Sequence, residues 1–206
     1  EGLGSIYWHM VSKLALATIE NVVDAKTDLS CPGLIARLIR HYREIRDGLG
    51  LEKTPLQYGA IPSDPYSHTP QHAGAQQPGM TGQVKEDILC RYSELGVQID
   101  QGQLRFAPDL FEDSEFLGED EVFRFYDLHD SQIDYPMSSG EFGFTVCQVP
   151  VIYHRSAETR LVIHCENIES LERSDLVLTL AESQSLFSRS GIIARIDVFF
   201  CPVSNT

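Results

Sequence analysis

Apolar residues near the start of the chain recur at helical spacing. From Ile6 to Val23 they return at intervals that keep one face of a helix apolar. The next apolar run has clearer ends, because Ser30 can cap a helix, Pro32 suits its first turn and Gly48 stops it. A short polar link separates the two runs. The pattern therefore predicts an antiparallel helical hairpin.

The helical pattern then disappears and returns once. Residues from Thr54 to Gly79 hold five of the ten prolines and follow neither the helical nor the strand period, which predicts a long loop. Loops of that length inside compact chains are commonly functional. A third helix is predicted from about Thr81 to Leu95, with Gly96 as its stop.

After Gly96 the period of the apolar residues changes to two, which is the period of a strand. Gln101-Gly102 is a two-residue turn signal between two short runs and predicts a β-hairpin. The predicted strands are Val97–Asp100, Gln103–Phe106, Val122–Tyr126, Phe142–Val149, Arg160–Cys165, Leu176–Leu180 and Ile192–Phe200. Many short strands without a further helical stretch favour an antiparallel β-sandwich of the jelly-roll kind.

These patterns predict an α+β chain in two parts. Residues 1–96 hold the helices and the long loop, and residues 97–206 form a C-terminal β-sandwich domain. Three helices cannot enclose a core of their own, since each needs a partner for its apolar stripe. We therefore expect them to complete a larger helical domain whose other members lie upstream of Glu1.

Charge and cysteine content narrow the range of partners. The chain carries 30 acidic and 16 basic residues, a net charge of −14, whereas nucleic acids and anionic membranes attract clustered Lys and Arg. We expect neither partner. No apolar run reaches the roughly 20 residues that a membrane helix needs. The five cysteines form no Cys-x-x-Cys pair, and scattered thiols favour a reducing, cytoplasmic compartment.

The predicted loop carries the most concentrated chemistry. His68 and His72 have the four-residue spacing of two metal ligands on a helix, but Pro70 between them argues against a helix and no third ligand is evident. We therefore expect no metal site and no cofactor. Gln76 and Gln77 can bind sugar hydroxyls, because an amide both donates and accepts hydrogen bonds.

The start of the third predicted helix adds a place for an anion. Thr81 and Gly82 lie where free N–H groups and the helix dipole favour a phosphate or a sugar oxygen, although Thr81 can equally serve as a simple cap. Glu86, one turn into the helix, is the candidate catalytic carboxylate. Glycoside hydrolysis uses a pair of carboxylates, so Glu86 would need a partner across a pocket. An acidic residue in a first turn also suits the dipole, and that alternative stays open.

The order of these features resembles the C-terminal end of the cellobiose phosphorylase family and, more broadly, of enzymes built on a six-hairpin α/α barrel. The resemblance extends from about Ser5 to Phe106, and the rest matches only in being β-rich. The motifs that carry it are Tyr58-Gly59-Ala60-Ile61-Pro62, His72-Ala73-Gly74, Thr81-Gly82 and Leu95-Gly96-Val97.

The resemblance implies a fold and a reaction. In that family a catalytic barrel is followed by a small β domain, and the last barrel loop and helix line the active site. His72 and Thr81-Gly82 would stand where the family holds inorganic phosphate, the co-substrate for inverting phosphorolysis of an oligosaccharide or glycoside. The family's general acid lies in the upstream barrel, so this chain is expected to be inactive alone. A homodimer is a further expected assembly.

One departure from the family bears on the reaction. Ala75-Gln76-Gln77-Pro78 stands where the family usually shows Arg-Gly-Gly-Trp, so a cation and an aromatic sugar platform are missing. Phosphorolysis and hydrolysis of a glycosidic bond are therefore both open.

Two functions from other classes are also open. A non-catalytic carbohydrate-binding or interaction module would show a row of exposed aromatic residues on one sheet face; Tyr126, Tyr135 and Tyr153 are candidate members, but their spacing does not produce such a row. A small autonomous hydrolase would combine His72 with Asp64 or Glu86, but no Gly-x-Ser-x-Gly stretch supplies its nucleophile.

Overall fold

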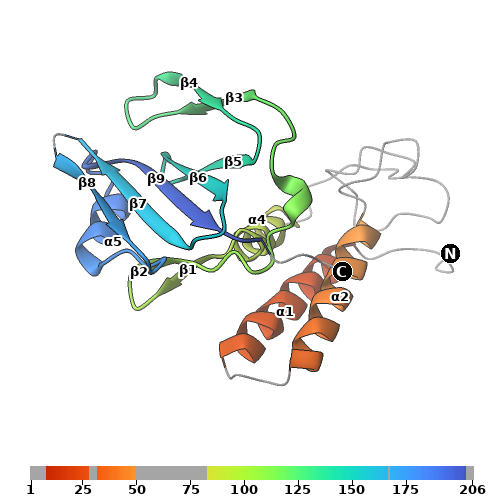
Figure 1. The fold of residues 1–206 in the computed structure, drawn as a ribbon. Coiled ribbons are helices and arrows are strands. Elements are labelled where there is room, and N and C mark those ends of the chain that lie inside the picture. Colours follow the sequence, from red (N-terminus) through yellow and green to blue (C-terminus); the bar gives the residue numbers. More distant parts are fainter. Residues whose placement is uncertain (1–7, 28–31, 50–82, 167, 203–206) are drawn as a thin grey trace, which may run out of the picture. The chain divides into compact units, whose positions relative to one another are not determined.

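The protein is an α+β chain in two compact units. A computed structural model describes residues 8–27, 32–49, 83–166 and 168–202 (Figure 1). The units are residues 1–93 and residues 94–206. The spacing of apolar residues in the sequence predicted that helices give way to strands at Gly96. The mixture of helices and sheets that this spacing predicted is confirmed.

The first unit contains helices that begin and end close to the predicted positions. They are α1 (Trp8–Thr27), α2 (Pro32–Leu49) and α4 (Gln83–Glu94). α1 packs against α2 (Figure 1). Ala15, Ile19 and Val22 form the buried stripe of α1, because residues three and four apart share one face of a helix.

The second unit is built on a five-stranded sheet with the order β5-β6-β9-β7-β8. Its strands are β5 (Glu141–Val146), β6 (Val149–Arg155), β7 (Arg160–Cys165), β8 (Ile168–Arg173) and β9 (Ile193–Phe200). Neighbouring strands are antiparallel except β6 and β9, which run parallel. A purely antiparallel arrangement was predicted and is wrong at this pair. The parallel pair forms because β7, β8 and a helix supply the long crossover connection that parallel strands require.

Two hairpins accompany the sheet. The first is β1 (Val97–Asp100) and β2 (Gln103–Phe106), joined by the predicted two-residue turn at Gln101-Gly102, and both turn residues have positive φ. A short helical turn, η1 (Asp113–Glu115), precedes the second hairpin, β3 (Glu121–Tyr126) and β4 (Gln132–Met137). This hairpin packs on β5 at Gly143, where an added Cβ would lie 2.8 Å from Met137 Sδ and 2.9 Å from Phe123 Cδ1.

The strand predicted at Leu176–Leu180 is wrong. Val177 makes only an isolated bridge with Arg105, and the helix α5 (Leu180–Phe187) begins where the strand was expected to end. Thr179 caps this helix: its hydroxyl accepts from the Glu182 N–H while the Glu182 carboxylate accepts from the Thr179 N–H. This reciprocal pair is the Thr-x-x-Glu capping signature.

The strand predicted at Phe142–Val149 is two strands joined by a turn. Cys147 and Gln148 both have positive φ and separate β5 from β6. The core of the second unit lies against the inner face of these strands. Phe111 and Tyr153 are fully buried there and contact each other edge to face, and the Tyr153 hydroxyl donates to the carbonyl of Leu95.

Candidate functional site

Glu86 is the predicted catalytic residue, and it lies buried in the first turn of α4. Its residue is 4% exposed, and its Oε1 lies 3.6 Å from the Nζ of Lys13 on α1. Within the part of the chain that the structure describes, its Oε2 is buried and has no hydrogen-bond partner. A buried carboxylate oxygen without a partner is costly. The arrangement therefore leaves one acceptor for a ligand hydroxyl.

Ion pairs fix the start of α4 within the first unit. Beside Glu86, Asp87 accepts a 2.9 Å hydrogen bond from Arg46 Nη1 on α2. The Arg46 side chain is largely buried, whereas Lys13 is more than half exposed and its pair with Glu86 is screened by solvent. The two pairs connect α4 to α1 and to α2.

The other predicted site residues lie outside the described residues. α4 is described from Gln83, the residue that follows Gly82. The structure therefore does not test whether these residues approach Glu86, and their roles stay predictions. They are His68, His72, Gln76, Gln77, Thr81 and Gly82.

The helices of the first unit keep large apolar side chains exposed to solvent. Scattered exposed apolar residues are ordinary on a protein surface, but here all the described helices of the unit carry them. Each side chain is between 41% and 54% exposed. They are Met10 and Leu14 on α1, Leu34 on α2, and Ile88, Leu89 and Tyr92 on α4.

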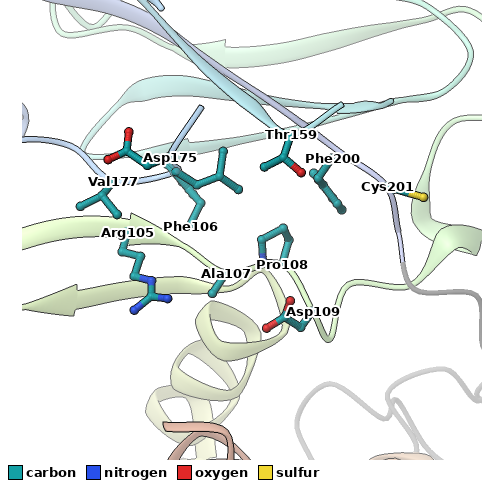
Figure 2. A pocket seen from close by; sticks show the side chains of 11 residues that line it. Arg105, Phe106, Ala107, Pro108, Asp109, Thr159, Asp175, Val177, Phe200 and Cys201 are labelled. Atoms are coloured by element: carbon teal, nitrogen blue, oxygen red, sulfur yellow. The ribbon is translucent and has the colours of Figure 1, made fainter. Parts of the chain in front are cut away.

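The second unit contains a cavity of about 380 Å³ (Figure 2). Phe106, Pro108 and Phe200 are buried residues that form its apolar lining. Exposed polar side chains complete the wall, and Figure 2 shows them to come from several segments. Among the described residues, the guanidinium of Arg105 and the carboxylate of Asp175 have no hydrogen-bond or ion-pair partner. The remaining lining residues are Ala107, Asp109, Thr159, Leu176, Val177 and Cys201.

A cluster of charged side chains on the outer face of the five-stranded sheet was not predicted. We call it the Asp197 cluster, and its members are Glu141, His154, His164, Arg195 and Asp197. Asp197 on β9 is 6% exposed, and its Oδ2 lies 2.7 Å from His164 Nε2 and 3.0 Å from Arg195 Nη2. His154 Nδ1 lies 3.1 Å from Glu141 Oε1, and its Nε2 lies 3.4 Å from Asp197 Oδ1.

The cluster stabilises the ionised form of Asp197. Burial alone would raise the pKa of this carboxyl, but the contacts with His154, His164 and the charge of Arg195 outweigh burial and hold the pKa below its usual range. Tyr135 on β4 covers Arg195, whose guanidinium carbon lies 5.4 Å from the centre of the ring. Burial raises the pKa of the Tyr135 hydroxyl.

The sequence contains a signal for this cluster. Arg195 and Asp197 alternate with apolar residues in a run that otherwise has the composition of a buried strand, and His164 interrupts a similar run. Charged residues inside such strands need partners. The pattern identifies the residues that need a partner, but it does not say which strands bring them together.

The three tyrosines that a binding module could use do not form an exposed row, in agreement with their spacing in the sequence. Tyr153 is in the core, Tyr135 is half-buried, and Tyr126 on β3 is exposed. In the described parts of the chain, no group of three or more His, Cys, Asp or Glu side chains is arranged to hold a metal ion. None of the described helices is both long enough and apolar enough to cross a membrane.

No protein-family model and no curated protein matches this sequence.

Proposed function

We propose that this chain is the C-terminal part of a carbohydrate-active enzyme, a glycoside phosphorylase or glycoside hydrolase of the six-hairpin α/α-barrel type. The first unit supplies the last helices of the barrel, and the second unit is its C-terminal β-sandwich domain. The enzyme cleaves glycosidic bonds of an oligosaccharide or glycoside. Its general acid lies in the upstream part of the barrel, so this chain alone is inactive.

The observation that carries the proposal is the exposed apolar surface of the helices. Fully burying a Leu- or Ile-sized side chain stabilises a protein by about 1.5–3 kcal/mol, so a half-exposed one leaves on the order of 1 kcal/mol unrealised. Exposed apolar positions occur on α1, α2 and α4. Further helices of a barrel would cover these positions, because every helix of an α/α barrel packs against neighbours on either side.

The buried carboxylate of Glu86 supports a catalytic role in that barrel. Its Oε2 has no hydrogen-bond partner among the described residues and is a buried acceptor, and a hydrogen bond from a sugar hydroxyl or an attacking water is stronger there than in bulk solvent. In hydrolysis Glu86 acts as the general base for water. In phosphorolysis inorganic phosphate attacks instead, held by His72 and by the hydroxyl and amides at Thr81-Gly82.

The remaining predicted residues bind the sugar. His68, Gln76 and Gln77 can donate and accept hydrogen bonds with hydroxyl groups next to the scissile bond. No metal or organic cofactor takes part in the proposed reaction, and inorganic phosphate is the co-substrate only if the enzyme is a phosphorylase.

The test uses the product of the complete reading frame that contains this chain. The purified protein is incubated with disaccharides and aryl glycosides, with and without inorganic phosphate, and the products are separated by ion chromatography. A sugar 1-phosphate formed only with phosphate identifies a phosphorylase, and a free sugar formed in both conditions identifies a hydrolase. A reading frame without further barrel helices, or a folded product without turnover of any substrate, would contradict the proposal.

Glu86→Gln separates a catalytic role from a structural one. General acid–base groups contribute roughly 10²- to 10⁴-fold, so kcat should fall by at least about 100-fold with little change in KM. The matched control is Glu20→Gln on α1, which removes an equal charge from an exposed position and should keep full activity. Equal activity of the two variants would exclude Glu86 as the catalytic base.

A second candidate function, saccharide binding without catalysis, is favoured by the cavity of the second unit. Its apolar lining suits the C–H face of a sugar ring, and the side chains of Arg105 and Asp175, which have no partner among the described residues, can bind vicinal hydroxyls. Titration calorimetry with mono- and oligosaccharides tests it. Asp175→Ala should abolish the binding, whereas Glu119→Ala, which removes an exposed carboxylate elsewhere, should not. Absence of heat with every sugar would exclude this candidate.

A further inference from the structure

Three polar side chains lie in a row across neighbouring strands of the second unit. Asp197 is on β9, His164 on β7 and Ser170 on β8, and these strands are consecutive in the sheet. His164 Nε2 lies 2.7 Å from Asp197 Oδ2, and His164 Nδ1 lies 3.0 Å from Ser170 Oγ. The pairing of β7 is irregular at His164 against both neighbouring strands: the register shifts between Ile163 and Cys165 in the pairing with β8 and between His164 and Cys165 in the pairing with β9. Such irregularities redirect a side chain from its regular position.

The ionised state of Asp197 sets the direction of each hydrogen bond in this row. An ionised carboxylate only accepts, so His164 Nε2 carries the hydrogen and donates it to Asp197. In the neutral ring Nδ1 then keeps its lone pair, and the Ser170 hydroxyl donates to it. Either ring nitrogen of a histidine can act as a base. This is the proton arrangement that activates a serine.

Arg195 lies against both members of the His164–Asp197 pair. Its Nη2 lies 3.0 Å from Asp197 Oδ2 and 3.0 Å from His164 Nε2. A protonated Nε2 has no lone pair to accept, so the guanidinium donates to the carboxylate oxygen. Arg195 and His164 therefore hold Asp197 Oδ2 together, and the positive charge of Arg195 keeps that carboxylate ionised.

Exposure increases along the row toward solvent. The Asp197 side chain is 8% exposed, the His164 side chain is 30% exposed, and Ser170 is an exposed residue. The orienting group is thus protected from water while the nucleophile is accessible. β8 is an edge strand, and the edge of a sheet presents N–H groups that no strand pairs with. Such groups are the donors that stabilise an oxyanion.

We propose that Ser170 is a nucleophile for acyl transfer, with His164 as its general base and Asp197 as the positioning carboxylate, and that its substrates are small carboxylic esters. This activity is independent of the carbohydrate chemistry proposed for the first unit.

The reaction balances with water as the only co-substrate. Ser170 Oγ bonds to the ester carbonyl carbon, its proton moves to His164 Nδ1, and the carbonyl oxygen becomes an oxyanion. The C–O bond to the leaving alcohol then breaks, and His164 returns the proton to that alcohol. Water attacks the acyl-serine by the same steps, which releases the carboxylic acid and restores the Ser170 hydroxyl.

A fluorophosphonate probe tests the nucleophile directly, because it phosphonylates activated serines. The full chain is treated with the probe at neutral pH, digested, and searched for the modified peptide by mass spectrometry. We expect modification at Ser170 and at least about 100-fold slower modification in His164→Gln, in line with the contribution of a general base. Hydrolysis of p-nitrophenyl acetate, with a burst of nitrophenol equal to the enzyme concentration, is the second readout.

Two controls keep the test decisive. Ser170→Ala removes an exposed hydroxyl, so it should fold normally and lose both the label and the burst. Ser174→Ala removes an exposed serine beyond the end of β8 and should change neither. No label on Ser170, equal labelling of Ser170 and Ser174, or undiminished labelling of a His164→Gln variant with a normal circular dichroism spectrum would each overturn the proposal.

Discussion

The two units of this protein differ in how completely they bury their apolar side chains. In the second unit the rings of Phe111, Tyr153 and Phe200 contact one another edge to face in a closed core. In the first unit buried positions such as Ile19 share helices with half-exposed ones such as Leu14. Because the free energy of burial follows the area removed from water, the second unit gains most from this core, although it too keeps apolar side chains such as Ile99 and Tyr126 exposed.

The largest effect that this comparison predicts is in the core of the second unit. Phe111 is 1% exposed and contacts four other aromatic rings, so Phe111→Ala should lower the free energy of unfolding of this unit by about 3–5 kcal/mol. Urea denaturation followed by near-UV circular dichroism measures it. Ile99→Ala, at a residue 63% exposed on β1, is the control and should cost less than about 0.5 kcal/mol. Similar losses for both would mean that the core is loosely packed.

The next largest effect is the electrostatic contribution of Asp197 to the stability of the second unit. The pKa of Asp197 is lowered in the folded state, so its contribution is present above the ordinary aspartate pKa of about 3.9 and is lost as the pH falls through the folded value. Asp197→Asn should cost about 2 kcal/mol at pH 7, less than a fully buried pair because its partners are partly exposed.

The pH series provides its own control. The difference between Asp197→Asn and the unmodified protein should stay near its full size at pH 4 and should shrink as urea denaturation is repeated at pH 3 and below. Asp134→Asn breaks an exposed pair with Arg124 and should change little at any pH. A penalty for Asp197→Asn that is the same at pH 3 and pH 7 would show that lost packing, and not lost charge, causes it.

Much of the fold was predictable because local signals and tertiary structure agree. α2 begins at the predicted Pro32, and the β1–β2 hairpin has the predicted strands and turn. The prediction was wrong where the local signal was weak or misread. Cys147-Gln148 forms a turn with positive φ without the Gly or Asn that marks such turns, and Leu180 was assigned to a strand although Thr179 and Glu182 form a capping box.

The candidate sites were predictable only in part, and the reason is topological. Glu86 stood out because it follows a helix start, but its burial and its contact with Lys13 depend on how α1 packs near α4. The row of Asp197, His164 and Ser170 requires β9, β7 and β8 to be consecutive in the sheet. That order follows from the antiparallel pairing of β7 with β8 on one side and with β9 on the other, and no local pattern of residues encodes the pairing with β9, which is distant in the sequence.

A smaller effect is expected at the cap of α5. Thr179→Ala removes the hydroxyl that accepts from the Glu182 N–H, and loss of such a cap costs about 1 kcal/mol. Urea denaturation of the second unit measures it. Thr159→Ala, at an exposed threonine before β7, is the control and should have no effect on stability. Equal stability of Thr179→Ala and the unmodified protein would mean that the Glu182 carboxylate alone suffices to begin the helix.

The smallest predicted effect tests whether further helices cover the exposed apolar side chains of the first unit in the complete protein. Ile88 on α4 is 50% exposed, so Ile88→Ser should change the stability of this chain by no more than about 0.5 kcal/mol. Trp8 is the only tryptophan and lies in α1, so its fluorescence follows unfolding of this unit alone.

The same substitution should cost more in the product of the complete reading frame. There, covering helices would raise the cost of Ile88→Ser to about 1–3 kcal/mol. The control is Ile19→Ala at a buried position, which would cost about 2–5 kcal/mol in this chain and in the complete protein. If Ile88→Ser is already costly in this chain, its apolar face is covered here, and the argument for further barrel helices loses its basis.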